Sequence, residues 1–378
     1  MSKKIKGLVI VLLAVGIFVG CSRFSNVVPR DITGLVDSVQ KKFAPDKRLS
    51  VFDIQLQKKG DQLIVTGEVS DSTLWHVLKD SIQAHAKNLD LIFSVVSLPE
   101  KALGDSTFGI IDVSTAHLRK QPKHAAEMLS QAVLGSVVRL LKKKDGWYFV
   151  QMEDRYLGWM SKTSFWRTDS SGVVRWKSGA HIIVKSPWGW IKKRPSRKST
   201  NLSDVVAGCI LPLRGKTGHW YRISLPGNKV GFLATSLAEP VKKWLLESAT
   251  PAAIVETGKQ FLGLPYLWGG TSSKGFDCSG FVQTVFKLNH IQLPRDANQM
   301  ALKGREIDPG ETFLNIAPGD LLFFGPSPGK ITHVALSIGK GKFYHADGYV
   351  HENSLVKGDS LFNAYRYRTF RMARRILK

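Results

Sequence analysis

Cysteine is scarce in this chain, whose 378 residues include only Cys21, Cys209 and Cys278. Three widely separated cysteines cannot form a disulfide framework, and they lack the short spacing of a structural zinc site. The ten histidines are scattered and do not supply the missing ligands. The sequence therefore predicts a fold held together by apolar cores, with no metal and no other cofactor.

Acidic residues are also few, with 30 Asp and Glu against 54 Lys and Arg, which gives a net charge of +24. Such a surface favours polyanionic partners. Nucleic acid is the obvious candidate, but the chain has neither an Arg-rich recognition helix nor an RNA-binding aromatic signature. We therefore expect no nucleic-acid partner, and we interpret the charge as affinity for an anionic cell envelope or as a source of solubility.

The first 21 residues hold a long apolar run, LVIVLLAVGIFV, which follows three lysines. This pattern is typical of a secretory signal, and the run is too short for a standard transmembrane span. An uncleaved anchor is the alternative. Gly20 before Cys21 resembles a lipoprotein processing site, which would leave Cys21 as the lipidated first residue. We expect an exported lipoprotein of the cell envelope that faces the periplasm.

Residues 22–105 predict a small α+β module without a catalytic constellation, and we interpret it as a spacer or docking domain. Apolar periodicity and turn residues indicate the order helix, hairpin, helix and strand. The predicted elements are a helix at 31–43, strands at 51–58 and 62–69, a helix at 72–87 and an apolar strand at 89–98.

Two repeats follow, because residues 135–160 align without a gap onto residues 208–233. Short alternating strands broken by Gly, Asp and Asn indicate small β-barrels, which we place at 106–168 and 169–240. The coinciding tryptophans are expected in the barrel cores, because tryptophan buries a large apolar area. The coinciding pairs are Gly135/Gly208, Trp147/Trp220, Tyr148/Tyr221 and Gly158/Gly231.

The stretch GLPYLWGGTSSKGFDCSGFVQTVF, residues 263–286, places a cysteine where a helix should begin. Asp277 is a good N-cap residue, so Cys278 is expected in the first helical turn. The positive end of the helix dipole would stabilise a nucleophilic thiolate there. The alternative is a cysteine that is simply a small buried apolar residue. The apolar residues with helical spacing are Phe281, Val282, Val285 and Phe286.

Two histidines near the C-terminus lie in strand-like stretches, His333 in KITHVALSIG and His345 in FYHADG. Residues 332–338 predict a strand and 339–342 a turn, so the histidines lie on neighbouring antiparallel strands. A two-residue turn would offset them by three residues, roughly 10 Å along the strand, whereas a longer loop would put them opposite each other. The pattern leaves both registers open. Either histidine can serve the cysteine as base, with the other as its orienting partner.

These motifs resemble those of the NlpC-type cell-wall cysteine peptidases, a papain-like family. The resemblance spans about residues 250–378 and includes PYLWGG, FDCSGFV, APGDLLFF, THVALSIG and FYHA in order. It implies an α+β papain-like domain in which Cys278 attacks an amide of a peptidoglycan stem peptide. By the same resemblance His333 is the base and His345 orients it.

The two barrels resemble bacterial SH3-type domains that accompany such peptidases. The opening of the first, VSTAHLRKQPKHAAEMLSQAVLG, resembles relatives that trim free muropeptides. There a glutamate and a tyrosine bind the free amine of the substrate's L-Ala, which corresponds to Glu127 and Tyr156. The second repeat has Lys229 in place of Tyr156. A solvated surface glutamate and an ordinary barrel tyrosine are the alternative.

The resemblance also implies roles for three residues of the cysteine stretch. Tyr266 matches the tyrosine of the PYxWGG motif and can help hold the oxyanion or the substrate, although a core tyrosine is the alternative. Asp277 and Ser279 would contact the amino end of the substrate, while an N-cap alone also explains Asp277. The motif LPRDANQ carries Ala297 where these relatives tend to have a serine that contacts the substrate.

The resemblance therefore implies an exported cysteine peptidase that cleaves between γ-D-Glu and diaminopimelate or Lys in released muropeptides with a free L-Ala. Two other readings stay open for the whole chain: a peptidoglycan-binding lipoprotein without activity, and an endopeptidase that acts on intact cell wall. A hydrolase or acyltransferase for another amide is a third, since the same triad serves many acyl groups. The pattern does not indicate an oligomeric state.

Overall fold

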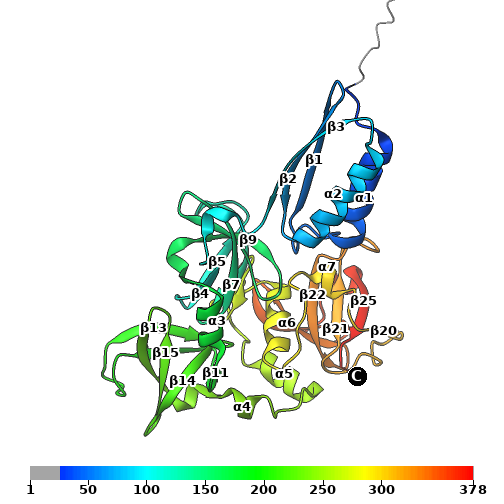
Figure 1. Cartoon of the computed structure of the whole chain (residues 1–378). Helices are drawn as coiled ribbons and strands as arrows, with labels where there is room; N and C mark the ends of the chain where they lie inside the picture. The colour runs from blue at the N-terminus through cyan, green and yellow to red at the C-terminus, as the bar shows by residue number, and fades with distance from the viewer. Residues whose placement is uncertain (1–25, 378) are drawn as a thin grey trace, which may run out of the picture.

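The computed structural model describes residues 26–377 of the chain (Figure 1). A small N-terminal module is followed by two seven-stranded β-sheets and a C-terminal domain with a six-stranded sheet, which confirms the predicted multidomain fold. Cys21, the predicted lipidation residue, lies outside the described residues. None of the helices between residues 26 and 377 has the length and apolarity that spanning a bilayer requires.

The N-terminal module packs two helices against one three-stranded sheet (Figure 1). Strands β1 and β2 form the predicted antiparallel hairpin, but β3 pairs parallel to β2, so helix α2 is the crossover between them. All five elements predicted from the sequence are present. They are α1 Arg30–Phe43, β1 Phe52–Lys59, β2 Gln62–Val69, α2 Ser72–His85 and β3 Asp90–Ser97.

Barrel 1 has the strand order β10-β4-β7-β8-β9-β5-β6. The short 3-10 helix η1, Lys101–Leu103, precedes it, and η2, Lys162–Ser164, lies between its last two strands. Helix α3, Ser170–Lys177, links it to the second barrel. The strands are β4 Phe108–Ile111, β5 Thr115–Arg119, β6 Met128–Val133, β7 Val137–Lys144, β8 Trp147–Gln151, β9 Leu157–Ser161 and β10 Phe165–Thr168.

Barrel 2 repeats the hairpins β7-β8-β9 as β14-β15-β16, in agreement with the sequence repeat. Trp147 is buried as predicted, whereas Trp220 is only half-buried. Helix η3, Thr235–Leu237, precedes the last strand, and α4, Val241–Trp244, follows it. The strands are β11 His181–Val184, β12 Trp188–Lys192, β13 Asn201–Val206, β14 Ile210–Thr217, β15 Trp220–Leu225, β16 Lys229–Ala234 and β17 Ala238–Pro240.

The C-terminal domain is an antiparallel sheet, in the order β20-β25-β21-β22-β23-β24, against which helices α5 and α6 pack. A two-stranded hairpin, β18-β19, directly precedes α6. The elements are α5 Pro251–Lys259, β18 Thr271–Ser272, β19 Gly275–Phe276, α6 Cys278–Lys287, α7 Ala297–Met300, β20 Arg305–Ile307, β21 Leu321–Phe324, β22 His333–Gly339, β23 Lys342–Asp347, β24 Tyr349–Ser354, α8 Ala364–Thr369 and β25 Phe370–Arg375.

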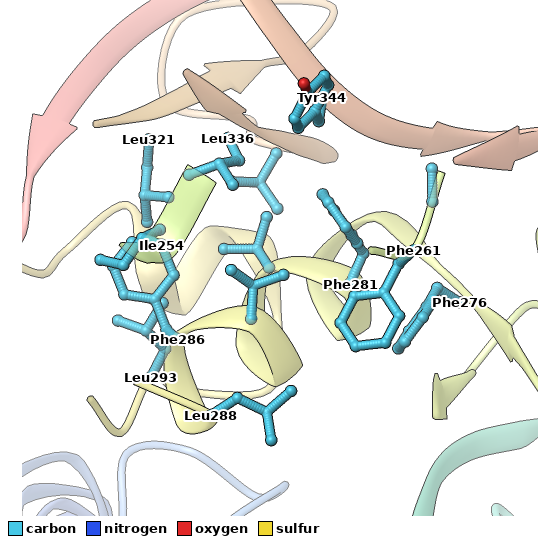
Figure 2. Close-up of a cluster of buried hydrophobic side chains, with 14 of the residues drawn as sticks. Ile254, Phe261, Phe276, Phe281, Phe286, Leu288, Leu293, Leu321, Leu336 and Tyr344 are labelled. Carbon is cyan, nitrogen blue, oxygen red and sulfur yellow. The ribbon is translucent and has the colours of Figure 1, made fainter. Parts of the chain in front are cut away.

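Helix α6 is the centre of this domain's core (Figure 2). Phe281 and Phe286 are fully buried among apolar side chains of α5 and the sheet, including Leu336 of β22. Gly280 lets the helix approach the preceding loop, since a Cβ atom there would lie 1.9 Å from the Gly270 carbonyl oxygen. The first turn of α6 is therefore held close to both the sheet and the loop.

Barrel 1 joins the C-terminal domain through Gln131, a buried residue of β6. Its side-chain Oε1 accepts hydrogen bonds from the Thr271 backbone N–H (3.0 Å) and the Ser272 hydroxyl (2.8 Å). Its backbone carbonyl accepts a third from the Thr271 hydroxyl, at 2.9 Å. The hairpin that leads into α6 is thus tied directly to the barrel.

We expect the substitution Gln131→Ala to lower the free energy of unfolding by about 2 kcal/mol, because it leaves a buried N–H and a buried hydroxyl without their acceptor. Urea unfolding at pH 7.5 measures the change. Gln83→Ala, at an exposed position of α2, is the matched control and should stay near wild type. Equal unfolding midpoints for the two variants would show that the Gln131 junction contributes no stability.

Candidate active site

Cys278 is the first residue of α6, and Asp277 caps the helix as predicted. The Asp277 Oδ1 atom accepts a hydrogen bond from the Gly280 N–H at 2.6 Å. Cys278 is partly exposed, and the backbone N–H of Val334 in β22 acts to lower the pKa of its thiol. The structure therefore brings the cysteine beside the first residues of β22, where His333 lies.

His333 and His345 are joined by a hydrogen bond of 3.0 Å between Nε2 and Nδ1. Neither register considered from the sequence is correct. The turn is short, but a bulge between Ser337 and Gly339 shifts the pairing, so that Leu336 lies opposite Tyr344. The histidines are then offset by two residues, and an even offset puts their side chains on the same face of the sheet.

Asn353 of β24 extends this pair into a chain of three side chains. The His345 Nε2 atom lies 3.0 Å from Asn353 Oδ1, an acceptor that also receives a hydrogen bond from Asn363 Nδ2 at 2.8 Å. His345 must therefore carry its proton on Nε2 and accept at Nδ1. It follows that His333 donates from Nε2 and keeps its Nδ1 lone pair free to take a proton. The sequence offered no signal for Asn353.

Burial keeps both imidazoles neutral. It lowers the pKa of His345 to about 3, with the charges of His351 and Arg366 as further causes. It also lowers the pKa of His333 well below its ordinary value, again with help from Arg366. At neutral pH the pair is an uncharged proton acceptor.

The Cys278 thiol is also neutral in the free protein. Burial raises its pKa to about 11, and the negative charge of Asp277 adds to the effect. Hydrogen bonds from backbone N–H groups and the charge of Arg295 act in the opposite direction but are outweighed. The expected thiolate at the helix start is therefore wrong for the free protein, because burial and a neighbouring carboxylate outweigh the helix dipole.

Arg295 forms a buried ion pair that holds the start of α6, and the sequence reasoning missed it. Its Nη2 lies 2.5 Å from Asp277 Oδ2, and its Nη1 donates to the Ser279 hydroxyl at 2.9 Å. Its Nε donates to Ser130 of barrel 1 at 3.1 Å. Asp277 and Ser279, predicted to face the substrate, are thus both engaged by the same guanidinium. A lone arginine in LPRDANQ was the only sequence signal.

Tyr266 is half-buried in the loop before β18. Its backbone N–H donates to the Gly348 carbonyl at 2.8 Å, which ties the loop to the end of β23. Burial raises the pKa of Tyr266 to about 12, and Cys278 is the next cause. The phenol is therefore a neutral hydrogen-bond donor near the sulfur.

Barrel 1 contributes Glu127 and Tyr156 to the same region. Trp268 of the PYLWGG loop donates from Nε1 to Glu127 Oε1 at 3.2 Å, while Lys120 contacts the other carboxylate oxygen at 3.1 Å. The Tyr156 hydroxyl donates to Asp296 Oδ2 at 2.9 Å. The two barrel residues thus contact the C-terminal domain through Trp268 and Asp296, which the sequence analysis did not single out.

Among residues 26–377 no group of three or more His, Cys, Asp or Glu side chains has the arrangement of a metal site. The chemistry that the described side chains support is nucleophilic acyl transfer. A thiol, a neutral imidazole with a free lone pair and a second imidazole that orients the first are the parts it needs.

The neutral histidines predict a pH-dependent stability. The unfolded chain binds protons on His333 and His345 as the pH falls below about 6.5, whereas the folded chain does not. The contribution of these histidines to the free energy of unfolding is therefore fully present above this pH. It falls below this pH, by up to about 1.4 kcal/mol per pH unit for each histidine. Urea unfolding between pH 7.5 and 5 should show a shallower loss for His345→Gln than for wild type.

The matched control for this experiment is His219→Gln, at an exposed position of barrel 2. Its stability should follow the wild-type pH dependence. If stability fell equally with pH in His345→Gln and in wild type, His345 would bind protons equally in the folded and unfolded chains. That result would refute the prediction that His345 is neutral in the folded protein.

Comparisons with known proteins agree with this geometry. The NlpC/P60 family model matches residues 263–375, and the model described as "Bacterial dipeptidyl-peptidase Sh3 domain" matches residues 118–165. A crystal structure of an NlpC/P60 family protein from Bacillus cereus superposes with a TM-score of 0.63 at 27% identity. It covers 72% of this chain and 100% of its own.

Two curated relatives carry the name gamma-D-glutamyl-L-lysine dipeptidyl-peptidase. The one from Bacillus cereus is 33% identical over 59% of this chain and 68% of its own length. The one from Bacillus subtilis is 32% identical over 57% of this chain and 71% of its own length. The resemblance inferred from the motifs is confirmed: this chain belongs to the NlpC/P60 family and is a cysteine-type peptidase.

Proposed function

We propose that this peptidase hydrolyses the amide between γ-linked D-Glu and the following diamino acid in released peptidoglycan stem peptides with a free N-terminal L-Ala. The names of the curated relatives support the bond. The observation that carries the restriction to free amines is the contact between Glu127 of barrel 1 and Trp268 of the catalytic domain. It presents a carboxylate at the loop that leads to Cys278.

The proposed reaction begins with proton transfer, because the resting thiol is neutral. His333 takes the Cys278 proton at Nδ1 as the sulfur attacks the amide carbonyl carbon. The hydrogen bond to His345 holds the ring and stabilises the imidazolium that forms. The first N–H groups of a helix lack intrahelical partners, so the Cys278 N–H and the Tyr266 hydroxyl are suited to receive the oxyanion.

His333 then delivers its proton to the leaving amine of the diamino acid, and the dipeptide remains on Cys278 as a thioester. Water, deprotonated by His333, attacks this thioester and releases the dipeptide with a free carboxylate. The sulfur then takes from His333 the proton that came from water. Two protons therefore pass through His333 in each turnover: the thiol proton goes to the leaving amine, and a water proton goes to the sulfur.

The substrate's ammonium would bind between Glu127 and Tyr156. The Tyr156 hydroxyl donates its proton to a hydrogen bond with Asp296, so its oxygen lone pairs remain free to accept from the ammonium. Lys120, which pairs with Glu127 in the free protein, has an exposed side chain and can move aside. Asp277 and Ser279 would line the same region, with Arg295 holding both side chains and offsetting the charge of Asp277.

We further propose that the chain is exported and lipidated at Cys21. The apolar N-terminal run and the small residue before Cys21 support this proposal. An envelope location fits an enzyme whose substrates are cell-wall peptides.

The proposed nucleophile is tested with the tripeptide L-Ala-γ-D-Glu-diaminopimelate and its Lys counterpart, with products identified by mass spectrometry. Wild-type protein should release L-Ala-γ-D-Glu, and Cys278→Ala should abolish release. His333→Ala should lower kcat by at least about a thousandfold, since it removes the base. Release by Cys278→Ala at the wild-type rate would exclude this mechanism.

The amine requirement is tested with Glu127→Gln, which preserves the acceptor for Trp268 but removes the charge. We expect KM for the free tripeptide to rise by about tenfold or more, with little change in kcat, because a charge-assisted contact is lost. Glu153→Gln, which removes another exposed carboxylate of barrel 1, is the control. Equal rates on N-acetylated tripeptide or intact sacculi would instead indicate an endopeptidase of the intact wall.

The protonation of the resting thiol is tested by iodoacetamide labelling without substrate. Labelling of Cys278 should be slow at pH 7 and should rise with pH toward about 11, because only the thiolate reacts. Mass spectrometry of the labelled peptide follows the rate, and the small thiol glutathione is the reference. A plateau below pH 8 would mean that the free protein holds a thiolate after all.

A further inference from the structure

Arg48 belongs to the loop between α1 and β1 in the N-terminal module, yet its side chain ends in the catalytic domain. Its Nη1 atom lies 2.7 Å from Asp296 Oδ2 and 3.1 Å from Asn298 Oδ1. Asp296 is the N-cap residue of α7 and follows Arg295 in the chain. A module predicted to be a spacer or docking domain thus inserts a cation beside the proposed substrate site.

Asp46 holds this guanidinium from behind. Its carboxylate accepts from Arg48 Nε at 2.9 Å and from Nη2 at 2.7 Å, a two-point pairing that fixes the plane of the guanidinium. The bond from Arg48 is the main reason that the pKa of Asp46 is lowered to about 2. Gln299 of α7 also donates to Asp46, at 2.6 Å. The loop therefore contacts the first turn of α7 twice, through Arg48 with Asp296 and through Asp46 with Gln299.

Asp296 Oδ2 is the point where three modules meet. The same oxygen that accepts from Arg48 accepts from the hydroxyl of Tyr156, at 2.9 Å. Tyr156 is 5% exposed, and burial, followed by the charge of Asp296, raises its pKa above the ordinary value. The phenol therefore stays protonated, and Asp296 determines the direction in which that proton points.

We propose that Arg48 is a positioning residue for the amine-binding site: it fixes Asp296, which accepts the Tyr156 hydroxyl proton and so leaves the oxygen lone pairs of Tyr156 to accept from the substrate's ammonium. The inference rests on the proposed function, because it assigns a role at the same site. The N-terminal module then completes the substrate-binding end of the peptidase.

Two physical effects of Arg48 on the ammonium have opposite signs. As a nearby cation it repels the ammonium, so its removal would tighten binding if Coulomb repulsion dominated. As the partner of Asp296 it keeps the tyrosine oriented, so its removal would weaken binding. The Asp296 side chain is 27% exposed, where solvent screens the repulsion. The positioning effect should therefore prevail, and the direction of the change in KM separates the two effects.

The test measures KM and kcat of Arg48→Met on the free tripeptide, with the full chain. We expect KM to rise about tenfold with kcat within about twofold of wild type, since a misplaced binding group affects substrate affinity most. Arg48→Lys, which can reach Asp296 but cannot pair at two points with Asp46, should recover part of the loss. Lys47→Ala removes an exposed cation from the same loop and should match wild type.

A double-mutant cycle with Tyr156→Phe separates positioning from a merely structural role. Because Arg48 acts through the tyrosine hydroxyl, Arg48→Met should add nothing to the KM of Tyr156→Phe. Additive effects would overturn the inference. So would an unchanged or lower KM in Arg48→Met while Tyr156→Phe raises it, an outcome that leaves the proposed function standing. If Tyr156→Phe itself left KM unchanged, the amine site of the proposed function would fail, and the inference with it.

A milder variant covers the case in which Arg48→Met does not fold. Asp46→Asn weakens the pairing that holds the guanidinium but leaves Arg48 itself unchanged. Thermal unfolding reports whether the variant is folded. We expect KM to rise a few-fold in the folded variant, and again not in the Tyr156→Phe background. No rise in KM would overturn the inference.

Discussion

The position of Cys278 depends on the contacts that the carboxylate of Asp277 makes. It caps α6, accepts a bond from the Gly269 N–H and forms a buried ion pair with Arg295. Breaking a buried pair of this kind leaves an uncompensated charge, at a typical cost of about 3–5 kcal/mol. One carboxylate therefore sets the start of the helix, the course of the glycine-rich loop and the position of the sulfur between them.

The guanidinium of Arg295 also links the start of α6 to barrel 1, because its Nε donates a hydrogen bond to Ser130. Gln131, which bonds the β18-β19 hairpin, Tyr156, which donates to Asp296, and Glu127, which accepts from Trp268, add further polar contacts between barrel 1 and the catalytic domain. The proposed amine-binding site thus lies at a junction between domains, whereas the sulfur and the imidazoles belong to one domain. This division fits the proposal that barrel 1 restricts the substrate range while the catalytic domain carries the family's chemistry.

Sequence patterns predicted much of this architecture. Local periodicity and turn residues were enough for the N-terminal elements, the paired barrels and the helix that begins at Cys278. What escaped prediction depends on long-range geometry. The bulge at Ser337 and Gly339 set the register of the histidines, and Asn353 and Arg295 gained their roles only when distant segments met. The protonation of the cysteine depended on burial, which a pattern of residue types does not reveal.

The neutral resting thiol has a consequence for the chemical durability of the protein. Oxidants such as peroxide and disulfides react with the thiolate, so a sulfur that keeps its proton until substrate arrives is spared. Cys209 is fully buried, which raises its pKa to about 12 and shields it in the same way. Both thiols should therefore react with peroxide and with disulfides more slowly than a free cysteine does at neutral pH.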